Sequence, residues 1–288
     1  MENLIQLLST PICCEAQARN ALMTSLLMAL KNGDIFSVEK KLSEQKEIKS
    51  VGYAFDENLK PNIISEWSVD NENLPENSVA VIFLEGIIFP YKVFDIENKI
   101  KAIEQNPKII ATVLFINSPG GYTVRTDILS DVIKNAAKPI AVNISAQCCS
   151  AAMEIACCAK RIFCNSVQDV LGSIGTYTTF YSFKKYFEDA GIECRDIYAT
   201  LSVRKNEESR ALEDDVNDDE KMVKYLDVFN ERFHQIIAEA YKLDRSDDLF
   251  TGRLIFANEA ITKGIAHEIA PIENAVQWAF IEGLKNSG

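Results

Sequence analysis

Three short segments of this chain carry residue types that can perform acyl-transfer chemistry. Asn117-Ser118-Pro119-Gly120-Gly121 directly follows the apolar run 109–116, so we expect a buried strand to end there in a glycine-bearing turn. Adjacent glycines leave backbone N–H groups uncovered, and such groups at the carboxyl end of a parallel strand can stabilise a developing oxyanion. Further along the chain come Ser150, at the start of a predicted small-residue helix, and the segment Gly172-Ser173-Ile174-Gly175.

Ser150 is the candidate nucleophile. It is followed by Ala151 and Ala152, whose small side chains leave room for a peptide backbone to approach. A helix N-terminus also adds positive potential, which favours a nucleophilic hydroxyl at that position. Serine is equally a preferred helix N-cap residue, so its position alone fits capping as well as catalysis.

A serine nucleophile needs a base that removes its proton. The histidines of this chain, His234 and His267, fall in or beside predicted helices, where packing roles explain them. A lysine whose pKa is lowered by burial can serve instead. Lys205, which follows a predicted strand near 194–200, is the candidate base, and Lys221 and Lys224 come next.

The elements that must position these residues alternate between apolar runs and amphipathic helices from Ser78 onward. This pattern predicts βαβ units and a parallel sheet buried on both faces. We expect strands at 79–84, 109–116, 139–144 and 161–164, an extended segment at 172–180, and helices at 93–105, 123–136, 150–159, 181–190, 216–241, 257–263 and 273–284, with a polar segment before the helix at 216–241.

The polar stretch Asp70-Asn71-Glu72-Asn73, followed by Pro75, predicts a boundary between two parts of the chain. Residues 1–75 form an N-terminal extension with a helix near 15–31 and short strands near 51–55 and 62–67. Residues 76–288 form the main domain.

Composition excludes several classes of protein. A net charge of −12 argues against a nucleic-acid binder, because phosphate neutralisation requires clustered basic residues. The eight cysteines form no CxxC motif and several lie in apolar runs, so we expect free thiols, no metal and no other cofactor. The apolar run 21–30 is too short to span a bilayer and no signal peptide is recognisable. We therefore expect a cytoplasmic protein without a membrane anchor.

The order of the three segments resembles that of the S49 peptidase family, which includes signal peptide peptidase A and phage capsid-maturation proteases. The resemblance runs from about Val79 to Val276. It implies an α/β chain with the ClpP/crotonase-like fold, in which a parallel β-sheet core carries flanking helices and an N-terminal extension precedes them.

The resemblance also implies a Ser/Lys dyad, with Ser150 as nucleophile and Lys205 as general base. Ser173 would hydrogen-bond the lysine ammonium. The N–H group of Gly120 or Gly121, together with that of Ala151, would form the oxyanion hole.

The function implied is that of a serine endopeptidase, most closely of the phage or prophage head-maturation type. Its substrates would be protein or peptide chains, among them capsid or scaffold proteins, in the cytoplasm or inside an assembling phage particle. Members of the family form homo-oligomers, in which a neighbouring copy can complete a site.

Departures from the family pattern support an alternative. Ala151 and Ala152 stand where the family usually has glycines. The family also has a glycine shortly before its base and a proline after it, and neither occurs around Lys205. An ungapped alignment on Ser209-Arg210 places Val203 at the base position. The alternative is a catalytically inactive S49-like assembly or scaffolding protein.

Two other enzyme classes are disfavoured. A crotonase-type acyl-CoA enzyme would need carboxylates in its pocket. A ClpP-like Ser-His-Asp protease would need a histidine near 172–175.

Overall fold

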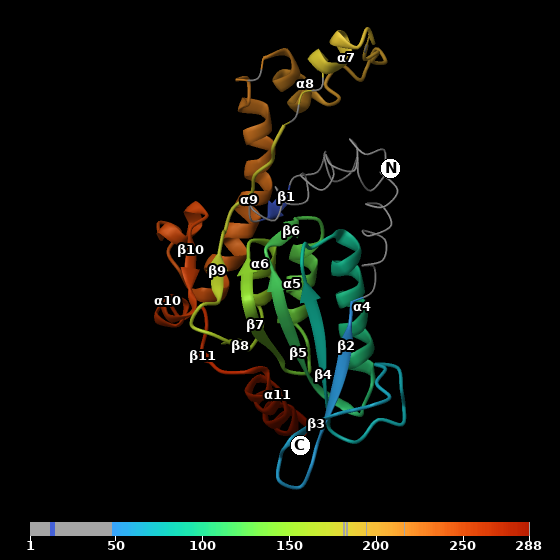
Figure 1. Ribbon diagram of the computed structural model, residues 1–288, viewed down its shortest axis with the longest axis vertical. Coiled ribbons are helices and arrows are strands. Elements are labelled where there is room, and N and C mark those ends of the chain that lie inside the picture. Colours follow the sequence, from blue (N-terminus) through green and yellow to red (C-terminus); the bar gives the residue numbers. More distant parts are fainter. Residues whose placement is uncertain are drawn as a thin grey trace.

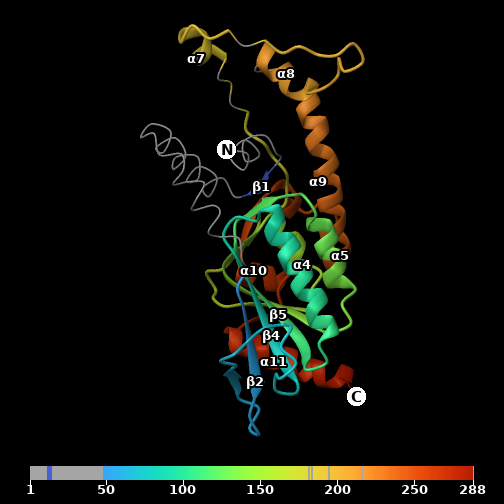
Figure 2. The ribbon, with the colours of Figure 1, turned by 90° about the vertical axis from the view of Figure 1, so that its right-hand side faces the viewer.

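The computed structural model describes residues 12–14, 48–180, 182, 184–193, 195–215 and 217–287 (Figures 1 and 2). In this part of the chain a nine-stranded sheet forms the centre, with the order β10-β9-β7-β5-β4-β2-β3; β8 also pairs with β7, and β11 pairs with β8. Its strands are β2 (Ser50–Phe55), β3 (Pro61–Ile63), β4 (Ser78–Glu85), β5 (Ile109–Ser118), β7 (Ile140–Cys149), β8 (Arg161–Cys164), β9 (Val170–Gly172), β10 (Leu254–Phe256) and β11 (Glu268–Ile269). A separate two-stranded sheet joins β1 (Ile12–Cys14) to β6 (Gly120–Tyr122).

The middle of the large sheet is parallel. β4 pairs with β5, β5 with β7, and β7 with both β8 and β9 in parallel register, whereas β2, β3 and β10 are antiparallel additions at the edges. This arrangement confirms the predicted α/β class with a parallel sheet core. Because β5, β7 and β9 run parallel to one another, their carboxyl ends lie at one end of the sheet.

Helices cover both faces of the sheet, as Figure 2 shows. α4 (Pro90–Gln105), α5 (Thr126–Lys134) and α6 (Ala151–Ala156) pack on one face, and α11 (Ile272–Ser287) packs on the other. Successive β4 side chains alternate between the two cores: Ala80 and Ile82 belong to the first, Val79 and Val81 to the second. Burial on both faces explains why the strand sequences are continuously apolar.

After β9 the chain leaves the body as an arm, which we define as α7 (Lys184–Asp189), α8 (Glu207–Asp214), their described connections, and the first half of α9 (Glu220–Tyr241). Figures 1 and 2 both show α7 and α8 far from the sheet. α9 returns to the body, where Phe233, Ile236 and Ile237 are buried. The 3₁₀ helix η1 (Asp248–Thr251) and α10 (Ala257–Thr262) follow it.

The strands predicted at 79–84, 109–116, 139–144 and 161–164 are confirmed. The strand predicted near 194–200 is wrong, because the described residues 195–200 form no strand. β9 ends at Gly172, and residues 173–180 continue without a helix. The predicted polar segment before α9 contains α8.

The N-terminal predictions have different outcomes. The helix predicted near 15–31 lies outside the described residues. The strand predicted near 51–55 is β2, which pairs with β4 and so belongs to the main sheet, and only the first part of 62–67 is extended, in β3. The division at residue 75 stays a prediction. None of the helices in the described ranges is both long and apolar enough to cross a membrane.

Candidate active site

Ser150 occupies the sharp turn between β7 and α6. Its backbone has φ 54° and ψ −123°, a left-handed conformation that non-glycine residues rarely adopt. Its N–H donates to the Gly172 carbonyl oxygen at 2.8 Å, and its own carbonyl oxygen accepts from the Met153 N–H at 2.8 Å. A serine on a strained strand-to-helix turn is the arrangement of nucleophile elbows in other hydrolases.

The Ser150 hydroxyl has no structural partner in the described part of the chain. The residue is 1% exposed, and its Oγ is buried without a hydrogen bond. It makes no side-chain capping bond to α6, so capping does not explain the serine. Leaving a hydroxyl buried and unpaired costs about 1–3 kcal/mol, which indicates that this side chain serves something other than stability.

The structure brings Ser173 close to Ser150. Cys149 and Gly172 are paired in the β7–β9 register, so the two serines follow directly on adjacent strand ends. Ser173 also has a positive φ, 52°, and its N–H donates to the Arg253 carbonyl oxygen at 3.0 Å. At Gly172 a Cβ would lie 2.3 Å from that same oxygen, which explains the glycine.

The glycine-bearing loop lies next to the same turn. Ser118, the last residue of β5, is paired with Cys148, two residues before Ser150. The Ser118 Oγ donates to the Gly86 carbonyl oxygen at 2.7 Å and accepts from the Gly120 N–H at 3.1 Å. Ser118 therefore holds the loop in place, a role that its position in the motif did not reveal. The Gly120 N–H is already engaged by this contact.

The backbone N–H and C=O groups of Gly121 lie on the side of β6 that faces away from Ile88. Ile88 accepts from the Tyr122 N–H at 2.8 Å and donates to the Gly120 carbonyl oxygen at 2.9 Å. Because backbone groups alternate along a strand, the N–H and C=O of Gly121 face away from Ile88. A Cβ at Gly121 would lie 2.1 Å from the Ile88 oxygen, so only glycine fits. α6 packs against β6, and the N–H of Ala151, in its first turn, has no acceptor within the helix.

Lys205 is not brought to Ser150 within one copy of the chain. It is exposed and lies two residues before α8, which packs on α9 in the arm. Both ribbon views place α8 at the far end of the arm from α6 (Figures 1 and 2). Lys221 and Lys224 are exposed at the arm end of α9, where Lys224 pairs with Glu220.

The two histidines differ in their surroundings. His267 accepts a hydrogen bond from the Ile162 N–H at its Nδ1, 3.1 Å away, which is a structural role. His234, on α9, lies beside Ile174, and the centroid of its ring is 5.0 Å from that of the Phe250 ring. Burial lowers the pKa of His234, while a hydrogen bond with the Ile174 backbone acts in the opposite direction. A histidine thus does lie near the segment 172–175, which corrects the sequence expectation; the long sequence separation concealed it.

Glu154 is a buried carboxyl group one helical turn after Ser150. It is 3% exposed, and its Oε2 accepts a hydrogen bond from the Thr126 hydroxyl at 2.9 Å. Burial raises the pKa of Glu154 to about 8, with the Thr126 bond opposing that shift. The Glu154 side chain is therefore mainly protonated at neutral pH, and it places no full negative charge beside the Ser150 turn.

Lys92 is a second buried ionisable group at this end of the sheet. Its Nζ donates to the Glu85 carbonyl oxygen at 2.6 Å, next to the Gly86 carbonyl that Ser118 uses. Burial lowers the pKa of Lys92 to about 8, against the effect of the Glu85 charge. Lys92 thus supports the turn on which the glycine-bearing loop rests.

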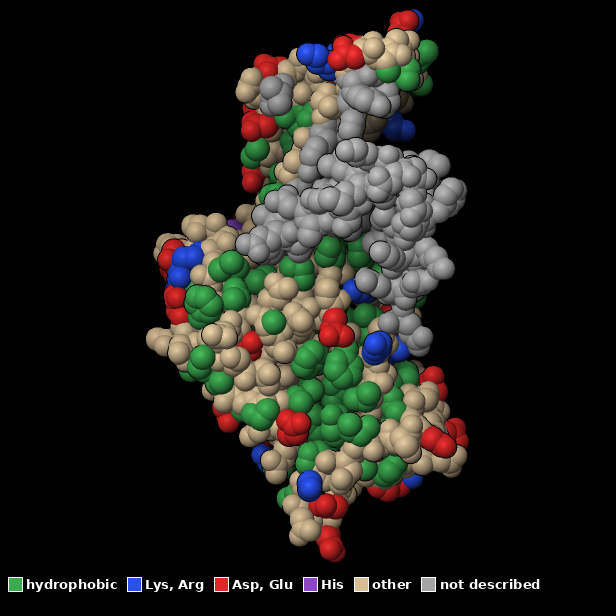
Figure 3. Space-filling model, viewed as in Figure 1, with side chains coloured by type: hydrophobic (Ala, Val, Ile, Leu, Met, Phe, Trp, Pro, Cys, Tyr) green, Lys and Arg blue, Asp and Glu red, His purple; other side chains and the backbone are tan. Residues whose placement is uncertain are grey.

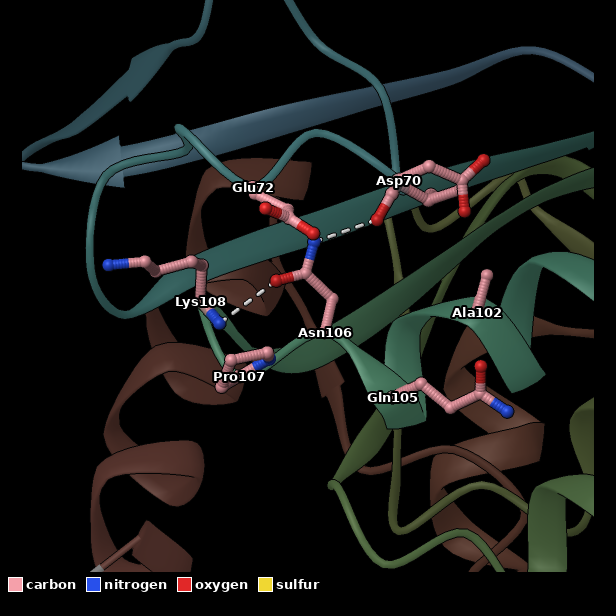
Figure 4. Close-up of a pocket in the computed structure, with 8 residues that line it drawn as sticks. Asp70, Glu72, Ala102, Gln105, Asn106, Pro107 and Lys108 are labelled. Carbon is pink, nitrogen blue, oxygen red and sulfur yellow. Dashed lines mark hydrogen bonds between the residues drawn. The ribbon is translucent and has the colours of Figure 1, made fainter.

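A pocket of about 440 Å³ lies elsewhere, beside the C-terminal end of α4 and the start of β5 (Figure 4). Its main polar contacts are structural, because Asn106 donates to the Val69 carbonyl at 2.8 Å and accepts from the Lys108 N–H at 3.0 Å. It is at the opposite end of β5 from Ser118 and takes no part in the site. The described residues contain no group of three or more His, Cys, Asp or Glu side chains placed to hold a metal ion.

Comparisons with known proteins define the class of this chain. The model described as Peptidase family S49 matches residues 133–283, more than half of the 288 residues, and the chain belongs to this family. The matched range includes Ser150, Ser173 and Lys205 but begins after the glycine-bearing loop.

Two curated relatives carry peptidase names. "Protease 4" of Haemophilus influenzae is 25% identical over 224 residues, covering 73% of this chain and 35% of that protein. "Serine protease SPPA, chloroplastic" of Arabidopsis thaliana is 22% identical over 187 residues, covering 63% of this chain and 27% of that protein. The chain therefore spans about a third of the length of these relatives.

Similar solved structures include ClpP1 from Listeria monocytogenes, with 18% identity, a TM-score of 0.44, and coverage of 68% of this chain and 94% of that one. An enoyl-CoA hydratase from Shewanella pealeana has 12% identity and a TM-score of 0.47, with coverage of 72% and 70%.

Proposed function

We propose that this chain is a serine endopeptidase with Ser150 as its nucleophile. The observation that carries the proposal is the strained Ser150 turn, whose buried Oγ lacks a hydrogen-bond partner in the described residues. The Oγ attacks a peptide carbonyl, and the N–H groups of Gly121 and Ala151 receive the negative charge on its oxygen. The amine leaves with a proton, and water then hydrolyses the acyl-enzyme ester.

We propose further that the base is Lys205 of a neighbouring copy. Lys205 is too far along the arm to serve its own Ser150, whereas an arm that extends from the body can reach another protomer (Figure 1). We expect Ser173, which follows β9 beside the Ser150 turn, to hydrogen-bond the incoming ammonium. A lysine inserted between two subunits is shielded from water, which is the setting in which lysines act as general bases.

The surface of the arm supports such an assembly. It exposes large hydrophobic side chains that a monomer would leave in water (Figure 3): Ile197, Leu201, Val203, Val223, Tyr225 and Val228. Leu201 is 98% exposed and lies four residues before Lys205. Large apolar side chains left in water by one protomer are typical of contacts between subunits, so we propose a homo-oligomer that forms through the arm.

For the natural substrate we propose protein chains of an assembling phage or prophage particle, such as capsid or scaffold proteins. Support comes from the sequence resemblance to the head-maturation branch and from the acidic composition, with a net charge of −12. The competing function is that of an inactive assembly protein, which the position of Lys205 in the isolated protomer favours.

The test combines turnover with covalent labelling. The oligomeric full chain is incubated with fluorescent casein and, separately, with a fluorophosphonate that reacts with activated serines. We expect casein cleavage and a single adduct on Ser150, both absent from Ser150→Ala. His234→Gln serves as the matched control and should retain labelling, because the proposed base is a lysine. An oligomer that neither cuts casein nor takes up the label would establish the inactive assembly protein instead.

A further inference from the structure

Two adjacent cysteines at the end of α6 form a pair of thiols. Cys157 is buried and Cys158 is partly exposed, and both are free. Their Sγ atoms are 3.8 Å apart, and the Cys157 Sγ also lies 3.1 Å from the Glu154 carbonyl oxygen, to which it donates. When Cys158 loses its proton, its charged sulfur becomes the stronger acceptor for the Cys157 S–H group. The pair thus combines an inner hydrogen-bond donor with an outer thiol that solvent reaches.

Charged side chains from two other helices surround Cys158. α6 packs on both α5 and α9, which lie side by side in Figure 2. α5 contributes Lys134 and Asp131, and α9 contributes Arg232. The hydrogen bond from Cys157 has the largest effect and lowers the pKa of Cys158; burial opposes it, the two cations lower the pKa further, and Asp131 raises it.

The thiols closer to the sheet are in the opposite situation. Cys148 and Cys164 are buried, and burial raises the pKa of each. The hydrogen bond to Cys158, together with burial, also raises the pKa of Cys157. Because the thiolate is the reactive form of cysteine, these three thiols are inert. Cys158 instead has the features of a redox-sensitive cysteine, which are a lowered pKa, access to solvent and a neighbouring thiol.

We propose that Cys158 is a site of reversible modification by small anionic disulfides, with oxidised glutathione as the probe. The Cys158 thiolate attacks one sulfur of the disulfide, a new S–S bond forms, and the old S–S bond breaks. The departing glutathione thiolate takes up a proton, so Cys158 is oxidised and half of the reagent is reduced. Lys134 and Arg232 attract the carboxylates of such a reagent. The inference does not use Ser150 and goes beyond the proposed function.

The mixed disulfide should stay on Cys158 instead of passing to Cys157. Displacement would require a thiolate at Cys157, which the raised pKa of that thiol disfavours. The peptide bond between the two residues is trans, which places adjacent Cα atoms about 3.8 Å apart, below the usual range of about 4.4–6.8 Å in disulfides. A reducing thiol such as dithiothreitol should remove the group and restore Cys158.

Peptide mass mapping of the full chain tests the proposal after incubation with oxidised glutathione at neutral pH. We expect one glutathionyl group on Cys158, none on Cys148 or Cys164, and its removal by dithiothreitol. Cys157→Ala loses the hydrogen-bond donor and should slow the modification by at least about threefold, since the loss of thiolate exceeds the gain in nucleophilicity. Cys157→Ser is the matched control, because its hydroxyl still donates, and should react at close to the wild-type rate.

A second comparison tests the charges. Lys134→Gln should slow the reaction with oxidised glutathione more than the reaction with cystamine, a disulfide whose ends are positively charged. The inference is overturned if Cys158 stays unmodified, or if Cys148 or Cys164 reacts before it. A disulfide between Cys157 and Cys158 in place of the glutathionyl group, or equal rates for Cys157→Ala and Cys157→Ser, would overturn it as well.

Discussion

The backbone N–H of Ser150 donates to the carbonyl oxygen of Gly172 at 2.8 Å, and this bond joins the nucleophile turn to the segment that carries Ser173. Both turns follow paired strands, so the sheet rather than side-chain packing sets the backbone positions of the two serines. A site built on strand ends in this way is rigid before any substrate arrives, which is the condition for effective acyl transfer.

Replacing the nucleophile should separate stability from activity. Ser150→Ala removes a buried hydroxyl that has no partner in the described residues, so we expect the free energy of unfolding to stay the same or rise by about 1 kcal/mol. Ser150→Gly also relieves the positive φ and should be stabilised further, by about 1 kcal/mol. Both should lose at least about 10³-fold in casein cleavage. Urea unfolding beside the activity assay checks this; a marked destabilisation of Ser150→Ala would show that the hydroxyl is structural.

The glycine-bearing loop should tolerate no side chain at Gly121. In Gly121→Ala the new Cβ would meet the Ile88 carbonyl oxygen at 2.1 Å, and β6 would have to move. We expect a loss of about 1–3 kcal/mol in the free energy of unfolding and at least about tenfold in casein cleavage. Gly175→Ala is the matched control, because its Cβ would find only the Asn230 Oδ1 at 3.8 Å. Equal behaviour of the two variants would contradict the tight packing of β6 on Ile88.

The buried carboxyl group of Glu154 should make stability depend on pH. Its pKa in the folded chain is about 8, above the usual value of 4.5, so the folded state holds a proton that the unfolded state has lost. Its contribution is fully present below about pH 4.5 and is lost as pH rises toward 8, at a slope of up to about 1.4 kcal/mol per pH unit.

Chemical unfolding of the wild type and Glu154→Gln at several pH values measures this slope. Glutamine can still accept from the Thr126 hydroxyl but does not titrate. The difference between the two curves removes the effects of Lys92 and the histidines, which both proteins share. We expect the wild type to lose stability relative to Glu154→Gln between pH 5 and 8, as the pKa shift requires. Parallel curves would show that Glu154 ionises normally.

Much of the fold could be predicted because its core strands are apolar on both faces. The alternation of Val79, Ala80, Val81 and Ile82 between two cores gives a continuous hydrophobic run, and such runs are readily recognised. The arm could not be predicted in this way. Its residues are mostly exposed, and without a buried face α8 gives no periodic pattern that distinguishes it from a polar connection.

The candidate site was predictable where it depends on short local motifs and not where it depends on distant parts of the chain. The sequence indicated Ser150, Ser173, Gly120 and Gly121, and the structure brings all four to one end of the sheet. It did not indicate the role of Ser118, which acts through hydrogen bonds to Gly86 and Gly120. The approach of His234 and the distance of Lys205 both depend on α9, whose direction no local pattern specifies.

The most direct test of the central claim mixes two inactive variants. Ser150→Ala and Lys205→Ala are purified separately, dissociated, mixed and reassembled, and casein cleavage is measured. If each Ser150 uses Lys205 of a neighbouring copy, random mixing restores complete pairs at roughly a quarter of the sites, and activity should return to about that fraction of the wild type. The same treatment of either variant alone should give none. A mixture that reassembles and stays inactive, while reassembled wild type is active, would contradict the shared Ser150–Lys205 site.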